Sequence, residues 1–153
     1  FEEFEEVIAR LRAPDGCPWD RAQTHMSLKK TCIEEAAEVI CGINILDQPG
    51  DADNLKEELG DLLMQVVLHA RIAEEKGLFT MDDVIQSIID KMIRRHPHVF
   101  GDFEGPGTDG SKESWEEIKK QEKAGKEWTE EYLPEAFEEA KELIDKAKER
   151  KGF

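Results

Sequence analysis

The sequence predicts an all-α fold, a bundle of amphipathic helices around one hydrophobic core. Charged residues make up 37% and apolar residues 39% of the 153 positions, and only 6 prolines are present. Apolar residues also recur every three or four positions over most of the chain, which is the helical period. Together with an aromatic content of 7%, this balance disfavours an all-β fold. The length is that of one domain.

The first half of the chain is expected to hold three helices. An acidic helix over residues 1–12 ends at the cluster APDGCPWD, because proline and glycine interrupt regular structure. Ser27 is a candidate N-cap for a second helix that runs to about Leu46. After the turn DQPGDAD, a third helix runs from about residue 54 to residue 76 and is closed by Gly77.

The second half is also expected to be helical, apart from one loop. A fourth helix over residues 81–95 stops before Pro97. Residues 96–110 carry four glycines and two prolines, a composition typical of a loop. A short helix should follow over residues 111–123, and a last amphipathic helix begins near Pro134, since proline suits the first helical turn.

Charge and cysteine content exclude several classes of protein. The formal net charge of −15 would repel a nucleic-acid polymer over most of the surface, so we expect no such partner. The three cysteines lack CxxC spacing and are typical of reduced thiols in a cytoplasmic protein. No apolar run approaches the length of a membrane span, so we expect no membrane association.

Two predicted helices carry acids where burial is expected. The segment IEEAAEV holds Glu34, Glu35 and Glu38, and its helix is otherwise apolar nearly all round. The segment EELGDLL holds Glu58 and Asp61, which lie beside the apolar stripe of the third helix and on the side that Leu68 and Ile72 continue. That stripe, the expected core face, consists of Leu55, Leu59, Leu62, Val66 and Ala73. A solvated surface is the usual explanation for isolated acids, but here they indicate a polar site within packed helices.

The acids of the two helices can face one another, because successive helices joined by a short turn pack antiparallel. Converging carboxylates repel strongly in a desolvated space unless something neutralises them. All-oxygen ligation suits Mg²⁺, with Mn²⁺ as a substitute. Gly60, in mid-helix at a cost of roughly 1 kcal/mol, indicates either close ligand approach or a tight helix crossing.

A basic cluster follows in the segment KMIRRHPHVF. Lys91 and Arg95 are one turn apart on the apolar side of the fourth helix. They either extend from the edge of the core and pair with acids, or they bind phosphate, for which a guanidinium is well shaped. Trp115 either packs on its short helix or stacks on a base, with Lys119 one turn further on.

The motifs together resemble the MazG family of all-α nucleoside triphosphate pyrophosphohydrolases. The resemblance rests on EExxE at 34–38 and ExxD at 58–61, with GCPWD, RRHPHVF and WEEIK in the same order as in the family. It covers residues 1–125, which form the MazG-like domain. Residues 126–153 look like a helix that connects to a second such domain in a longer protein.

The resemblance implies a function as well as a fold. It implies hydrolysis of NTPs or dNTPs to the monophosphate and pyrophosphate, with Mg²⁺-activated water attacking the α-phosphorus. It also implies a homodimer in which two protomers complete the four-helix core. In this interpretation the metal ligands are Glu35, Glu38, Glu58 and Asp61, the candidate bases are Glu34 and Glu35, and the nucleotide contacts are Lys91, Arg95, Trp115 and Lys119.

Two other kinds of protein also place acids on packed helices. A carboxylate-bridged di-iron site needs Glu-x-x-His pairs, and no histidine in this chain has Glu three residues before it. A catalytically weak module that binds Mg²⁺ and nucleotide, or only dimerises, fits the same motifs. Binding of nucleotide without turnover distinguishes that module from an enzyme.

Overall fold

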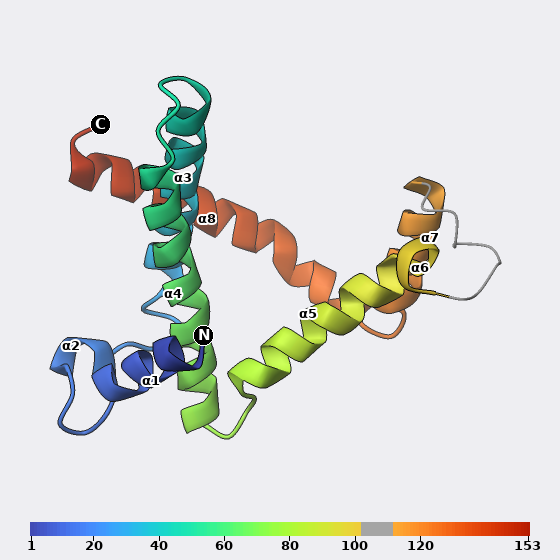
Figure 1. Ribbon diagram of the computed structural model, residues 1–153, viewed down its shortest axis with the longest axis horizontal. Coiled ribbons are helices and arrows are strands. Elements are labelled where there is room, and N and C mark those ends of the chain that lie inside the picture. The colour runs from blue at the N-terminus through green and yellow to red at the C-terminus, as the bar shows by residue number, and fades with distance from the viewer. Residues whose placement is uncertain (102–111) are drawn as a thin grey trace. The chain divides into compact units, whose positions relative to one another are not determined.

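The computed structural model describes residues 1–101 and 112–153, and it confirms the all-α fold (Figure 1). Within these two ranges every regular element is a helix. The elements are α1 (Glu2–Leu11), α2 (Pro18–Arg21), α3 (Lys29–Asp47), α4 (Asp53–Glu75), α5 (Met81–Arg95), α6 (Pro97–Phe100), α7 (Lys112–Lys123), the 3-10 helix η1 (Glu127–Tyr132) and α8 (Leu133–Lys151). In the described ranges no helix combines the length and the apolar character that a membrane crossing requires.

The helices form two compact units. The first unit comprises residues 1–81 and 138–153 and contains α1 to α4 with most of α8. The second unit comprises residues 82–137 and contains most of α5 together with α6, α7 and η1. The boundary at residue 125, expected from the sequence, stays a prediction.

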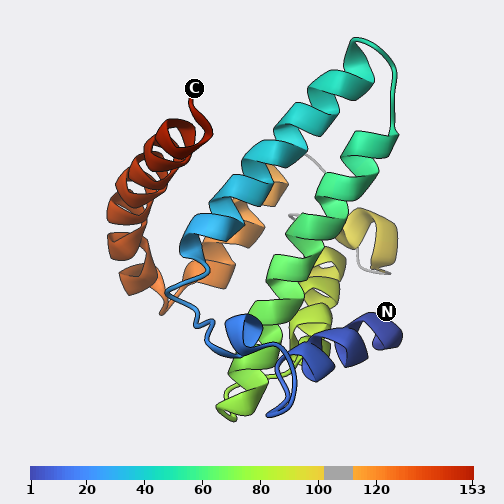
Figure 2. The ribbon, with the colours of Figure 1, turned by 90° about the vertical axis from the view of Figure 1, so that its left-hand side faces the viewer.

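An antiparallel pair of long helices, α3 and α4, is the frame of the first unit (Figure 2). The two helices approach each other closely at Gly42, where a Cβ would lie 2.8 Å from the Cα of Leu55 on α4. Such a distance is shorter than a carbon contact allows, so only glycine permits this crossing. In contrast, a Cβ at Gly60 would meet no atom of the described residues outside its own helix within 4 Å. The sequence allowed a tight helix crossing at Gly60. Within the described residues of one chain, the close approach of the two helices is at Gly42 instead.

The same substitution at these two glycines is therefore expected to have opposite effects. Gly42→Ala should lower the free energy of unfolding by about 1–3 kcal/mol, because the added methyl forces the helices apart. Gly60→Ala should raise it by up to about 1 kcal/mol, because alanine is the better helix former and meets open space. Urea denaturation of the two variants and the parent chain measures both changes. Equal changes in the two variants would contradict the assigned crossing.

The core of the first unit lies at the C-terminal half of α4. Leu68 and Ile72 are buried, as expected, together with Ile8 of α1. The predicted core stripe of α4 is only partly correct, because Leu59 is 50% exposed and Val66 is 40% exposed in the single chain. The described residues therefore leave part of the apolar face of α4, around Leu59 and Val66, exposed to solvent.

Arg12 joins α1, the following loop and α4. Its guanidinium donates two hydrogen bonds to the carboxylate of Glu75, at 2.9 and 3.0 Å. It also donates to the carbonyl oxygens of Asp20 and Gln23, so the GCPWD loop is held against the end of α4. The Arg12 side chain is only 7% exposed, and its hydrogen bonds hold the pKa of Glu75 below its usual value.

Most helix boundaries match the sequence predictions. Gly77 has a φ of 68° directly after α4, as expected of a residue that closes a helix. Ser27 is not an N-cap, because α3 begins at Lys29 and the Ser27 hydroxyl bonds Gln23 in the preceding loop. The predicted loop at 96–110 contains the short helix α6, with Pro97 at its first position, and its remainder from residue 102 lies outside the described residues. Helices α2 and η1 were not expected from the sequence.

Candidate active site

Three of the four predicted metal ligands lie together. Glu35 and Glu38 lie one turn apart on α3, and Glu58 faces them from α4. One carboxylate oxygen from each side chain lies within 4.8 Å of the other two, and all three residues are half-buried. The carboxylate cluster, as we call these three residues, is the arrangement that the antiparallel helices were predicted to produce.

The electrostatics of the cluster disfavour three negative charges. Burial, followed by the charges of Glu38, Asp61 and Glu58, raises the pKa of Glu35 to about 6. The Oε2 atom of Glu35 is also buried and accepts no hydrogen bond from the described residues. A buried oxygen without a donor is costly, so the cluster is poised to accept a cation or a proton.

Asn54 is a neighbour of the cluster that the sequence analysis missed. Its Nδ2 donates a hydrogen bond of 3.1 Å to Oε1 of Glu58, one turn along α4. The amide lies at the close helix crossing, where a Cβ at Gly42 would be 3.3 Å from its Oδ1. Spacing of i to i+4 could have indicated this contact, because such residues share a helix face.

The other predicted acids lie at the edge of the cluster. Asp61 is half-buried and close enough to raise the pKa of Glu35, but its oxygens are not within the group of three. Glu34 forms an ion pair with Arg150 of α8. Glu57, the neighbour of Glu58, is exposed.

Basic residues of α8 lie on the acidic face of α3, which was not expected from the sequence. Arg150 pairs with Glu34, and Lys151 pairs with Glu38 of the carboxylate cluster. At the other end of the contact, Lys29 of α3 pairs with Glu139 of α8 at 2.9 Å. These ion pairs connect α8 to both ends of the contact on α3, and Figure 1 shows that α8 crosses α3 at a steep angle. A cavity of about 370 Å³ lies between α3, α4 and α8, and Glu38, Glu58 and Lys151 line it.

The predicted nucleotide contacts belong to the second unit. Arg95 lies over the ring of Trp115, with its Cζ atom 5.3 Å from the ring centroid. Its guanidinium also donates to Glu122, at 2.7 and 3.0 Å, and these bonds hold the pKa of Glu122 below its usual value. Lys119 pairs with Glu116 at 3.6 Å, and Lys91 is half-buried on α5. The second unit brings Arg95 and Trp115 together, and Arg95 is engaged by an acid of α7.

His69 of α4 is half-buried and forms a hydrogen bond with another histidine. Its Nδ1 lies 2.8 Å from Nδ1 of His25, so one ring donates and the other accepts. The planes of the two rings are parallel to within 2°, as expected of a hydrogen bond that lies in the plane of both rings. Burial, followed by the charge of His25, lowers the pKa of His69. This pair ties the segment before α3 to α4.

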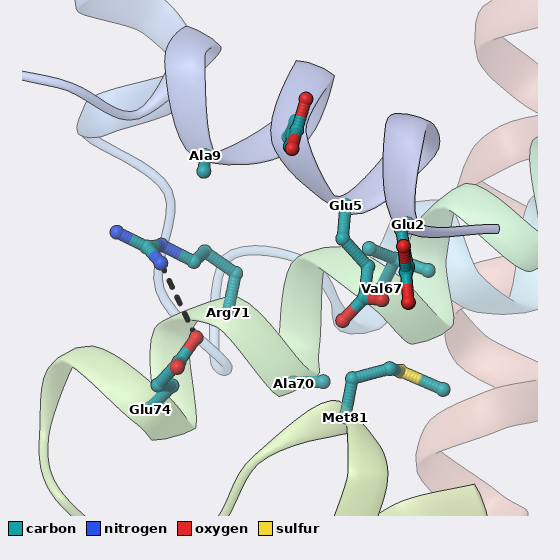
Figure 3. Close-up of a pocket in the computed structure, with 9 residues that line it drawn as sticks. Glu2, Glu5, Ala9, Val67, Ala70, Arg71, Glu74 and Met81 are labelled. Carbon is teal, nitrogen blue, oxygen red and sulfur yellow. Dashed lines mark hydrogen bonds and ion pairs between the residues drawn. The ribbon is translucent and has the colours of Figure 1, made fainter.

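A second cavity, of about 360 Å³, lies between α1 and α4 (Figure 3). Its rim carries the carboxylates of Glu2, Glu5 and Glu74, and its floor includes Val67. The cation at this cavity, Arg71, already pairs with Glu74 at 3.2 Å. An acidic rim repels phosphate, and none of the predicted site residues lines this cavity.

Known proteins resemble this chain over most of its length. A family model described as the MazG nucleotide pyrophosphohydrolase domain matches residues 23–100, which include the carboxylate cluster. The nucleoside triphosphate pyrophosphohydrolase/pyrophosphatase MazG of Thermotoga maritima is 54% identical over 126 residues, which are 82% of this chain and 46% of that protein.

Two further relatives extend the comparison. The nucleoside triphosphate pyrophosphohydrolase of Escherichia coli K12 is 43% identical over 121 residues, 78% of this chain and 44% of that protein. The uncharacterized protein YabN of Bacillus subtilis is 50% identical over 123 residues, 80% of this chain and 24% of that protein. The chain thus spans about half or less of the length of these curated relatives. The matched domain confirms the resemblance found in the motifs, and the chain belongs to the MazG nucleotide pyrophosphohydrolase domain family.

Proposed function

We propose that this chain hydrolyses nucleoside triphosphates, NTPs or dNTPs, to the nucleoside monophosphate and pyrophosphate. The observation that carries the proposal is the carboxylate cluster, in which Glu35, Glu38 and Glu58 bring oxygens within 4.8 Å of one another. The family membership of the chain supports the same reaction, because relatives are named nucleoside triphosphate pyrophosphohydrolases.

The cluster fits a divalent cation such as Mg²⁺. All its donor atoms are carboxylate oxygens, the ligands that Mg²⁺ and Mn²⁺ prefer. The buried, unpartnered Oε2 of Glu35 supports this assignment, since a cation would satisfy it. We assign cation binding to Glu35, Glu38 and Glu58, with Asp61 beside them. When bound, the cation supplies a Lewis acid toward phosphate oxygens and lowers the pKa of a nearby water.

Within this proposal, Glu35 is the better candidate for the general base. One oxygen of its carboxylate can bind the cation while the other accepts a proton from water, and no cation among the described residues pairs with Glu35. The other candidate, Glu34, is engaged by Arg150 in the ligand-free chain. As water adds to the α-phosphorus, its proton passes to the carboxylate and the bond to the departing pyrophosphate breaks.

The second unit would contribute to nucleotide binding. Arg95 and Trp115 already stack, an arrangement that can present a flat surface and a cation to a nucleotide. Phosphate binding by Arg95 would have to replace its bonds to Glu122. Lys91 and Lys119 are proposed as further phosphate contacts, which offset charge on the pyrophosphate.

A homodimer is proposed to complete the core. The uncovered apolar face of the first unit supports it, since large side chains of both α3 and α4 are exposed in the single chain. These are Ile40, Ile43, Leu46, Leu59, Leu63 and Val66. Apolar patches of this kind mark interfaces, and a second copy offers the same self-complementary surface.

The reaction is tested with purified chain, a panel of NTPs and dNTPs, and Mg²⁺. We expect nucleoside monophosphate and pyrophosphate in equal amounts, separated by ion-exchange chromatography. Release of orthophosphate alone, or of no product from any nucleotide, would overturn the proposed activity. Nucleotide binding without turnover would support the non-catalytic module instead. Addition of EDTA should stop the reaction, because the carboxylates alone cannot offset the charge of a triphosphate.

A further inference from the structure

The last turn of α8 places cations at the carboxylate cluster. Lys151 pairs with Glu38, and Arg150 pairs with Glu34 on the same face of α3. Lys148 and Lys151 also line the cavity beside Glu38 and Glu58. This contact joins residues more than 110 positions apart in the sequence, so it is a feature of the fold and not of local helix geometry.

The cavity beside the cluster has two kinds of lining. Apolar side chains, among them Ile144, Ala147 and Phe153, form much of its wall. Carboxylates of the cluster lie at one side, with the two lysines of α8 close to them. An apolar wall with a few convergent charges is typical of a site for a small charged ligand.

Lys151 and a divalent cation compete for the carboxylate of Glu38. A cation bound at the cluster attracts the Glu38 carboxylate and repels the ammonium group of Lys151. The displaced ammonium stays on α8, beside the bound cation and without its carboxylate partner. An anion that accompanies the divalent cation, such as a phosphate chain, can pair with both the bound cation and the displaced ammonium group.

We propose that Lys151, together with Lys148 and Arg150, binds the phosphates of the substrate, and that the ligand-free chain holds these cations on its carboxylates. The proposal rests on the proposed function, because it needs a divalent cation at the cluster. It adds a set of phosphate contacts from the first unit to those of the second. The substrate class is a nucleotide whose phosphates enter with the divalent cation.

One variant should move two affinities in opposite directions. In Lys151→Met, Mn²⁺ alone should bind several-fold more tightly, because its internal competitor is gone. Pyrophosphate in the presence of saturating Mn²⁺ should bind about tenfold more weakly, which is the loss of one charged contact. Isothermal titration calorimetry measures both. Lys151→Arg should restore pyrophosphate binding, because it restores the positive charge.

The matched control is Lys146→Met, which removes the same charge from the same helix. Lys146 lies five residues before Lys151, so it projects about 140° away from that side chain. It should change neither affinity beyond the small effect of net charge. Unchanged binding in Lys151→Met, or changes of the same sign for both ligands, would overturn the role of Lys151 and leave the proposed function standing. Failure of the parent chain to bind Mn²⁺ would overturn both.

Discussion

Glu58→Gln is expected to abolish binding of divalent cation and to reduce pyrophosphate release by at least about 100-fold. Loss of an outer-shell partner of a metal site typically costs 10- to 100-fold, and loss of a ligand should cost at least as much. Glu58 is an informative position of the carboxylate cluster because, unlike Glu38, it pairs with no cation of α8 among the described residues. The substitution removes one charge and leaves the shape of the side chain unchanged.

The measurement separates a lost ligand from a damaged fold. Thermal unfolding without metal should be unchanged or occur at higher temperature, since one of three repelling carboxylates is gone. The rise in melting temperature that Mg²⁺ produces in the parent chain should disappear. Glu57→Gln is the control, because it makes the same chemical change, from carboxylate to amide, at the adjacent exposed residue. Loss of activity in both variants, or in neither, would refute the assigned site.

The features that could be predicted from the sequence are those that depend on the spacing of residues along a single helix. Acids one turn apart on neighbouring antiparallel helices had to converge if the helices faced each other, and Glu35, Glu38 and Glu58 do so. A stripe of apolar residues also predicts α4 correctly. It does not say which surface covers the stripe, and for Leu59 and Val66 no part of the described chain does.

The features that sequence reasoning missed depend on contacts between distant segments. No local sequence pattern predicts the ion pair between Lys151 and Glu38, because this contact depends on how α8 packs against α3. The same holds for the two helical glycines. Gly42 was overlooked and Gly60 singled out, because a sequence shows that a glycine interrupts a helix but not which neighbour approaches it. Likewise, the pairing of Arg95 with Glu122 was not apparent.

Acidification should weaken the binding of divalent cation in a range set by Glu35. Because its pKa is raised to about 6, the carboxyl is mostly ionised at pH 7 and mostly protonated at pH 5. A cation must displace the proton, so Mn²⁺ affinity should fall about tenfold between these pH values, and binding at pH 6 should release part of a proton. Calorimetry in two buffers of different ionisation enthalpy measures both. Binding that is constant over this range would contradict the role of Glu35.

The same raised pKa gives stability the opposite dependence on pH. A carboxyl whose pKa rises on folding, from 4.5 to about 6, stabilises the metal-free chain fully below pH 4.5. This contribution is lost as the pH rises through 6, because ionised Glu35 is then a partly buried charge that also faces Glu38, Asp61 and Glu58. Glu35→Gln should therefore unfold at a higher temperature than the parent at pH 7 and at a similar temperature at pH 4.5. The titration of His69 contributes equally to both chains, so it cancels in the difference between their unfolding temperatures. Saturating Mg²⁺ should reverse their order at pH 7, since the cation stabilises only the chain that retains its ligand.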